Sequence, residues 1–133
     1  MVNSRKIEDL VIPLQTLFHM FRMAADEAGI NFIVTSTYRD EEFQIELYSQ
    51  GRTKPGKIVT WTKSSKHTER KAFDVAVLNE NNQPTWNLKA DVDKDSVPDY
   101  EELGRIGEHF GLTWGGSWKK KDYCHFELNE EEI

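Results

Sequence analysis

Four residues in two short segments carry side chains that could bind a metal ion and use it. His67 and Asp74 lie in the segment SSKHTERKAFD, and Asp122 and His125 lie in KDYCHFEL. Two imidazoles and one carboxylate form a zinc ligand set that leaves a fourth position for water or substrate. A further carboxylate beside that position could accept a proton from the water. Taken alone, Asp74 is more simply a structural carboxylate within a strand, so this interpretation depends on the four residues together.

The first half of the chain is expected to form two helices with a strand between them. Apolar residues recur at spacings of three and four over residues 5–28, which predicts an amphipathic helix that ends at Gly29. Pro13 either kinks this helix or moves its start to a later residue. A short buried strand is predicted at residues 32–35, and Asp40 is expected to cap a second helix that ends near residue 50.

The second half of the chain is expected to supply the strands that carry the metal ligands. The predicted order is an irregular loop, a strand, a polar surface segment, a helix and two strands, at residues 51–66, 72–78, 79–97, 98–110, 112–114 and 123–128. Successive side chains of a strand face opposite sides of a sheet, so Asp74 should face away from the apolar Phe73 and Val75. By the same alternation His125 should face away from Phe126. An α+β fold follows, in which helices pack on one face of a small, mostly antiparallel sheet and zinc lies in an open cleft on the other.

Composition indicates a globular protein and argues against two classes of function. The 133 residues are 38% hydrophobic and 30% charged, which suits a single domain over residues 1–133. No apolar run approaches the roughly 20 residues of a membrane span. The formal net charge of −6 argues against a nucleic-acid partner, and the lysine run at 119–121 is interpreted as a solvated loop. The segment MVNSRKIEDLVIPL lacks the features of a secretory signal, so synthesis in the cytoplasm is expected.

Several other residues of reactive or aromatic type are assigned to structural roles. His19 and His109 are expected at the surface of their helices, outside any site. Cys124 should point away from the histidine that follows it in the strand, so a buried and unreactive thiol is predicted. Trp86 and Trp114 are expected to pack in a loop or in the core.

Both ligand segments resemble the signatures of a family of zinc peptidases. SSKHTERKAFD resembles S-x-H-x-x-G-x-A-x-D, and WGGSWKKKDYCHFEL resembles W-G-G-D-W…D-x-x-H-F-E, of the VanY-like D-alanyl-D-alanine carboxypeptidases and L-alanyl-D-glutamate endopeptidases. The segment STYRDEEFQIELYSQGRTKPGKIVT is similar to the stretch that the endopeptidase branch, which includes phage endolysins, carries upstream. The resemblance covers roughly residues 30–128.

The resemblance implies a role for each matching residue of the reaction centre. His67, Asp74 and His125 would bind one zinc ion, and Asp122 would be the general base. Arg39 would bind the substrate carbonyl oxygen and stabilise the negative charge that develops there.

Further positions are expected to contact the substrate. Ser65 and Trp118 are expected to line the cleft, and Glu127 should either orient a ligand imidazole or contact substrate. Three positions depart from the signatures, and at one of them, Cys124, where proline is common, only the local geometry should change. Arg70 replaces the signature glycine, which matters if the backbone there has a positive φ angle. Ser117 replaces the acidic residue of W-G-G-D-W, so any substrate contact of that carboxylate is lost or reassigned.

These roles predict a peptidoglycan peptidase that uses metal-activated water and needs no covalent intermediate. The expected substrate is the L-alanyl-D-glutamate bond of the stem peptide, cut by a monomer with one Zn²⁺. One alternative is a D-alanyl-D-alanine carboxypeptidase, and another is a catalytically silent module that binds cell-wall peptide. The protein is expected to reach the cell wall after release from the cytoplasm, as in phage or prophage lysis.

Overall fold

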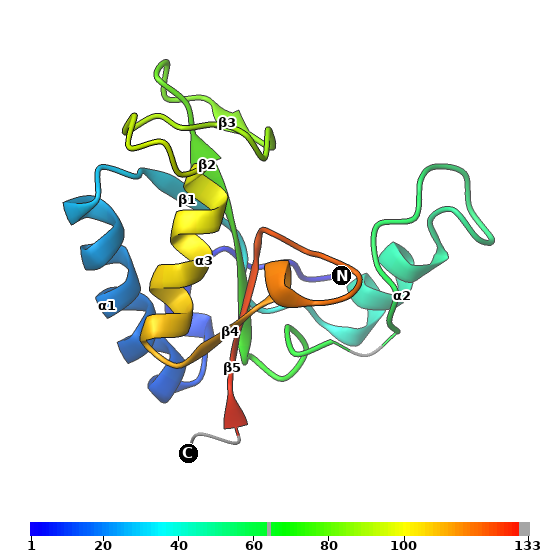
Figure 1. Cartoon of the computed structure of the whole chain (residues 1–133). Helices are drawn as coiled ribbons and strands as arrows, with labels where there is room; N and C mark the ends of the chain where they lie inside the picture. The colour runs from blue at the N-terminus through cyan, green and yellow to red at the C-terminus, as the bar shows by residue number, and fades with distance from the viewer. Residues whose placement is uncertain (64, 131–133) are drawn as a thin grey trace.

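An antiparallel sheet forms the centre of the computed structural model, which describes residues 1–63 and 65–130 (Figure 1). The strand order is β1-β2-β5-β4, and the short β3 pairs with β2. In chain order, β1 to β5 are Phe32–Ser36, Ala72–Leu78, Pro84–Thr85, Leu112–Trp114 and His125–Leu128. The prediction of an α+β fold with a small antiparallel sheet is confirmed.

Of the three α-helices formed by the described residues, two cover one face of this sheet. α1 (Ile12–Glu27) and α3 (Asp99–His109) lie side by side there, whereas α2 (Glu41–Ser49) lies on the other side of the sheet (Figure 1). The expectation that all helices pack on one face is therefore wrong for α2. Its buried residue is the polar Gln44, so α2 does not join the hydrophobic core.

Helix boundaries follow local chemistry. α1 begins at Ile12 rather than near residue 5, because Pro13 suits the first turn of a helix, and a 3₁₀ turn at Ile7–Asp9 precedes it. α2 begins after Asp40, whose side chain accepts a hydrogen bond from the backbone N–H of Phe43, as the sequence predicts.

The core lies between the sheet and the α1–α3 layer. Phe21 of α1 packs on Phe126 with ring centroids 4.8 Å apart, and Phe126 stacks on Phe73 at 5.5 Å. Phe73 and Val75 are fully buried in this core, so the predicted alternation along β2 is confirmed and the opposite face of the strand is left for Asp74.

Irregular segments lie on the face of the sheet that α1 and α3 do not cover. Residues 51–66 are irregular where the structure describes them, apart from a bridge between Gln50 and Lys54. The N-terminal segment runs beside the end of β1, where Asn3 pairs with Arg39. Among the described residues, no helix is long and apolar enough to cross a membrane.

Candidate active site

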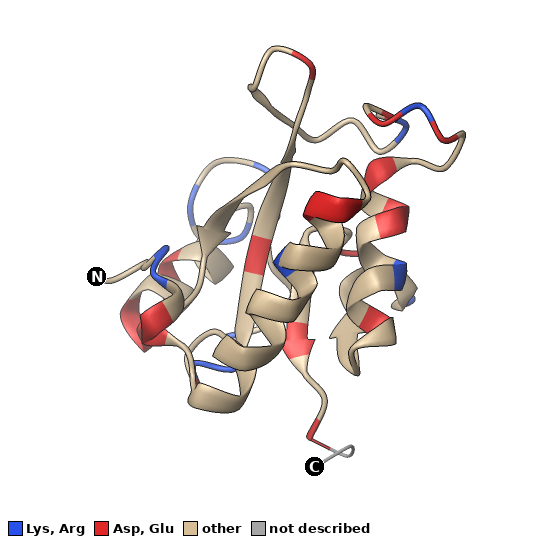
Figure 2. Ribbon diagram, turned by 90° about the vertical axis from the view of Figure 1, so that its left-hand side faces the viewer, with Lys and Arg blue, Asp and Glu red and all other residues tan. Residues whose placement is uncertain are grey.

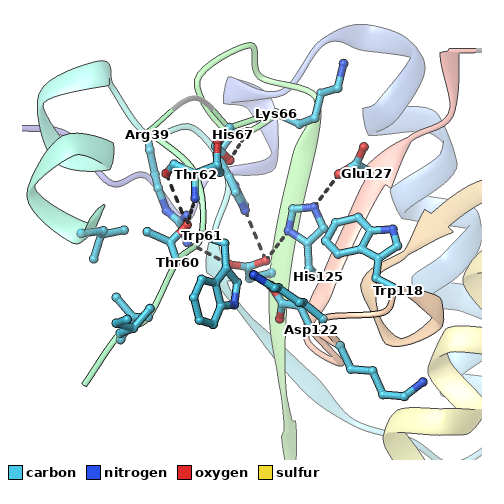
Figure 3. Close-up of a pocket in the computed structure, with 17 residues that line it drawn as sticks. Arg39, Thr60, Trp61, Thr62, Lys66, His67, Trp118, Asp122, His125 and Glu127 are labelled. Carbon is cyan, nitrogen blue, oxygen red and sulfur yellow. Dashed lines mark hydrogen bonds and ion pairs between the residues drawn. The ribbon is translucent and has the colours of Figure 1, made fainter. Parts of the chain in front are cut away.

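Two imidazoles and one carboxylate meet on the face of the sheet opposite the core (Figure 3). Asp74 Oδ1 lies 3.2 Å from His67 Nε2 and 3.1 Å from His125 Nδ1, and the three ligand atoms lie within 4.8 Å of one another. Asp74 on β2 and His125 on β5 are direct cross-strand partners, and His67 comes from the turn before β2. The structure thus brings together the three residues that the sequence predicts as metal ligands.

The outer nitrogen of each histidine has a hydrogen-bond acceptor of its own. His67 Nδ1 lies 2.7 Å from the carbonyl oxygen of Thr37, and His125 Nε2 lies 2.9 Å from Glu127 Oε1. A carbonyl can only accept, so His67 Nδ1 carries the proton and donates it. The same arrangement at His125 leaves both inner nitrogens for a metal ion, as is usual in protein metal sites. The donor set therefore fits a metal ion.

Electrostatics hold Asp74 charged and His125 protonated in the metal-free protein. Burial alone would raise the pKa of the Asp74 carboxyl, but the histidines beside it outweigh that effect and hold the pKa well below its usual range. Burial alone would lower the pKa of His125, but hydrogen bonds to Asp74 and Glu127 raise it to about 9. A metal ion that binds here at neutral pH must therefore displace a proton from His125.

Arg39 lies against the second oxygen of Asp74. Its Nη2 donates to Asp74 Oδ2 at 2.9 Å, Nε donates to Ser36 Oγ at 3.0 Å, and Nη1 donates to Gln44 Oε1 at 3.4 Å. Gln44 is fully buried on α2 and also donates to the carbonyl of Thr62. The buried Gln44 of α2 thus helps to hold the Arg39 guanidinium beside the metal-binding group.

Asp122 lies in the cleft and is held there by a tight turn. Its backbone N–H donates to the carbonyl of Gly115 at 2.9 Å, and its own carbonyl accepts from the N–H of His125 at 3.3 Å. A Cβ atom at Gly115 would lie 2.4 Å from the Asp122 carbonyl oxygen, so only glycine allows this approach. Desolvation by the surrounding protein and the negative charge of Asp74 raise the pKa of Asp122. A carboxyl group with a raised pKa beside a metal-binding group suits proton transfer.

An open cleft with a volume of about 700 Å³ surrounds these groups. Trp118 lines it with its ring centroid 5.1 Å from that of His125, as the sequence predicts. Trp61, Lys120 and Lys121 also line it, and Lys120 Nζ lies 3.8 Å from the centre of the Trp61 ring. Residues 119–121 are exposed, as the prediction of a solvated loop has it, and two of these lysines also face the open cleft. The sequence offered one signal for this location, because Lys120 and Lys121 lie between Trp118 and Asp122, two residues already predicted to lie in the cleft.

Two predicted substrate contacts already have protein partners. Ser65 lines the cleft, and its Oγ accepts a hydrogen bond from the backbone N–H of His67 at 3.1 Å. Glu127 also lines the cleft, while one of its oxygens accepts from His125. Of the two roles that the sequence leaves open for Glu127, the structure shows the bond to the ligand imidazole.

Arg70 and Ser117, two of the departures from the signatures, have different structural consequences. Arg70 has a φ angle of +63°, so this turn does adopt the conformation that favours glycine. Arg70 donates to the carbonyl of Asp9 at 3.0 Å and lies 4.0 Å from the centre of the Tyr38 ring. Ser117 is exposed, donates to Glu108 at 3.1 Å and lies outside the described lining of the cleft.

The side chains assigned to structural roles point away from the metal-binding group. All of them pack as expected except Trp86. His19 and His109 are exposed on α1 and α3. Cys124 packs against the core, and burial raises the pKa of its thiol to about 12, which keeps the thiol protonated and unreactive. Trp114 is buried, as expected, but Trp86 is 63% exposed, because the polar segment that carries it extends over the surface.

Comparisons with known proteins place the fold and the family. Residues 59–128 match the family described as D-alanyl-D-alanine carboxypeptidase. The peptidoglycan L-alanyl-D-glutamate endopeptidase CwlK of Bacillus subtilis is 36% identical over 110 residues, which cover 80% of this chain but only 66% of that relative. The crystal structure of the Serratia marcescens L-Ala D-Glu endopeptidase ChiX has the same fold, with a TM-score of 0.68, 23% identity and coverage of 98% of this chain and 91% of that one. More than half of this chain, including the metal-binding group and Asp122, lies within the family match, and the chain belongs to the D-alanyl-D-alanine carboxypeptidase family of peptidases.

Proposed function

We propose that this protein is a zinc-dependent peptidoglycan peptidase that hydrolyses the L-alanyl-D-glutamate bond of the stem peptide. The observation that carries this proposal is the group of His67, Asp74 and His125 at the base of an open cleft that also contains Asp122. The 36% identity to CwlK, which is named for cleavage of this bond in peptidoglycan, supports the choice of substrate.

Zinc is the metal that best suits the donor set. Two imidazole nitrogens and one carboxylate oxygen, with the outer nitrogens engaged by Thr37 and Glu127, match the ligands of catalytic zinc sites. When bound, zinc supplies a Lewis acid that makes water acidic and polarises a carbonyl group.

Asp122 is the proton carrier of the proposed reaction. Its carboxylate accepts the proton of the attacking water and returns it to the amine of the departing half of the peptide. Its raised pKa makes it a stronger base than an ordinary aspartate, and the Gly115 turn holds it in the cleft.

Arg39 stabilises the negative charge on the substrate carbonyl oxygen in this proposal. An arginine has five N–H donors, and the described bonds to Ser36, Gln44 and Asp74 use three of them. Two donors are left for the substrate, and the three existing bonds mean that no reorganisation of the guanidinium is needed. Trp61 and Trp118 offer apolar walls for the stem peptide.

A D-alanyl-D-alanine carboxypeptidase is the second candidate, since the matched family carries that description. Such an enzyme must recognise the free carboxylate at the end of the stem peptide. Lys120 and Lys121 line the cleft and could supply the positive charge for it.

Digestion of purified peptidoglycan by the zinc-loaded protein, with mass spectrometry of the new termini, tests these proposals. The endopeptidase produces new L-alanine carboxyl ends and new D-glutamate amino ends, whereas the carboxypeptidase releases D-alanine. Asp122→Asn should reduce either product at least about 100-fold while zinc stays bound, and Asp26→Asn on the exposed face of α1 is the matched control. Binding to peptidoglycan without new termini from the wild type would instead identify a non-catalytic binding module.

A further inference from the structure

A second group of carboxylates lies where the loop after β3 enters α3, away from the cleft. Figure 2 shows acidic residues gathered along this loop and in the first turn of the helix. The segment is DVDKDSVPDYEE, residues 91–102, and its carboxylates are Asp91, Asp93, Asp95, Asp99 and Glu102, besides Glu101. The first five of these occupy positions 1, 3, 5, 9 and 12 of the twelve-residue segment, and Glu101 occupies position 11.

This spacing is that of a calcium-binding loop. The EF-hand pattern D-x-D-x-D-G-x₅-E takes calcium ligands from positions 1, 3, 5, 7, 9 and 12, with glycine at position 6 for a sharp turn. The chain departs from the pattern only at that position, where Ser96 replaces glycine. Ser96 nevertheless has a φ angle of +72°, the left-handed conformation that glycine would adopt there.

The structure brings these carboxylates into two overlapping groups, each compact enough to hold a cation. Oxygen atoms of Asp91, Asp93 and Asp99 lie within 4.8 Å of one another, and so do oxygen atoms of Asp93, Asp95 and Glu102. Asp93 belongs to both sets, so the two groups of carboxylates are neighbours that share one residue.

A buried oxygen without a partner points independently to a missing ligand. Asp99 is completely buried, its Oδ2 accepts from the backbone N–H of Val92 at 2.9 Å, and its Oδ1 has no hydrogen-bond partner among the described residues. Asp93 Oδ1 and Glu102 Oε1 are buried without a partner as well. Within the described part of the chain, no ion pair involves any of the five carboxylates. Buried carboxylate oxygens without donors destabilise a protein unless a cation satisfies them.

We propose that residues 91–102 bind one calcium ion. The ligands are side-chain oxygens of Asp91, Asp93, Asp95, Asp99 and Glu102, and the carbonyl of Val97 at position 7 of the pattern completes the set. An all-oxygen site with this many ligands suits calcium, because magnesium requires a stricter octahedron and zinc prefers nitrogen and sulfur donors.

The site differs from an EF-hand in its surroundings. α3 is the helix that leaves the loop, but residues 87–90 before the loop form a turn rather than a helix. Calcium would therefore tie the loop to the first turn of α3 without moving a pair of helices. Since α3 packs on α1 and β4, the ion stabilises the whole fold through mass action on the folded state.

Calcium titration of the zinc-loaded, full-length protein tests this site. We expect a dissociation constant between about 10⁻⁶ and about 10⁻³ M by calorimetry, and a melting temperature at least about 3 °C higher in saturating calcium. Magnesium should raise the melting temperature less. Zinc saturation of the cleft keeps calcium away from His67, Asp74 and His125.

Glu102→Gln and Glu101→Gln form a matched pair of variants. Glu102 is the position-12 ligand, whereas its neighbour Glu101 pairs with Arg105 on the surface of α3. Burial and the neighbouring Asp95 and Asp93 raise the pKa of Glu102 to about 8. Glu102→Gln therefore replaces a largely neutral side chain at neutral pH, and it should fold without calcium at least as well as wild type but show no calcium-dependent rise in melting temperature. Glu101→Gln should respond to calcium like wild type. The proposal is overturned if the wild type shows no response at about 10 mM free calcium, or if Glu102→Gln responds equally.

Discussion

At the scale of single residues, the two histidines proposed as metal ligands are oriented by different partners. His67 donates to the neutral carbonyl of Thr37, whereas His125 is bonded to the carboxylate of Glu127. A carboxylate partner makes the imidazole more basic and a better ligand than a carbonyl partner does. Although Glu127 is not itself a proposed ligand, its carboxylate is thus expected to strengthen metal binding.

Replacement of Glu127 by glutamine should weaken zinc binding about 10- to 100-fold, because the negative charge beside His125 is lost while the shape of the residue 127 side chain is kept. Competition with a chelator of known affinity measures the change. Glu130→Gln, which removes an exposed carboxylate that pairs with Lys66 and Lys71, should leave the affinity unchanged. If the Glu127 variant binds zinc as tightly as wild type, Glu127 does not support the metal ligand, and substrate contact is its remaining role.

The raised pKa of His125 predicts how the stability of the metal-free protein depends on pH. The pKa is about 9 in the folded state, against an ordinary value of 6.5 for histidine, so the protonated imidazole stabilises the fold fully below pH 6.5. That contribution decreases as the pH rises from 6.5 to 9. Urea unfolding of metal-free wild type and His125→Gln across this range should show a free-energy difference that falls with pH. A difference that stays constant would contradict the assignment.

At the scale of elements, the turn between His67 and β2 determines where the ligands lie. Arg70 occupies a left-handed conformation in this turn, and its backbone bonds to His67 and to Val11 connect the turn to the start of α1. A non-glycine residue in that conformation costs about 1 kcal/mol or more. The contacts of Arg70 with Asp9 and Tyr38 offset part of this cost.

Two substitutions at Arg70 separate the backbone strain from the side-chain contacts. Arg70→Ala loses the contacts and keeps the strain, whereas Arg70→Gly loses the contacts and relieves it. The glycine variant should therefore be more stable than the alanine variant by about 1 kcal/mol, as measured by urea unfolding. The opposite order would mean that the turn relaxes out of its left-handed conformation when the arginine is removed.

At the scale of the whole molecule, the sheet separates stability from chemistry. One face carries the aromatic core and the α1–α3 layer, and the other carries the metal-binding group, α2 and the long connections (Figure 1). The proposed calcium site lies at the start of α3, so the two proposed metal sites occupy different parts of the fold. Loss of one metal should therefore have effects distinct from loss of the other.

Stepwise removal of the metals tests this separation. A chelator selective for zinc should abolish peptidase activity and lower the melting temperature, and added zinc should restore both. Removal of calcium alone should lower the melting temperature while the zinc-loaded enzyme remains active at temperatures where it stays folded. Equal loss of activity on removal of either metal at low temperature would show that the sites are coupled.

The sequence by itself determined most of the elements and the residue types of the proposed metal-binding group. Alternation in β2 and β5 predicted that Asp74 and His125 face away from the core, because side-chain direction along a strand depends only on local geometry. The strands Ala72–Leu78 and Leu112–Trp114 were predicted with these bounds because their apolar segments lie between polar or glycine-containing stretches. The acidic spacing of residues 91–102 was equally visible in the sequence, although the polar composition of that stretch favoured its interpretation as a plain surface segment.

Only the tertiary structure decided which distant groups meet and what holds them. The bond of Arg39 to Asp74, the position of α2 behind the cleft and the lysines on the cleft wall depend on contacts between segments far apart in the chain. The burial of Asp99 Oδ1 without a partner has the same origin. Local patterns specify direction along one element, but distances between elements follow from packing, which no local pattern contains.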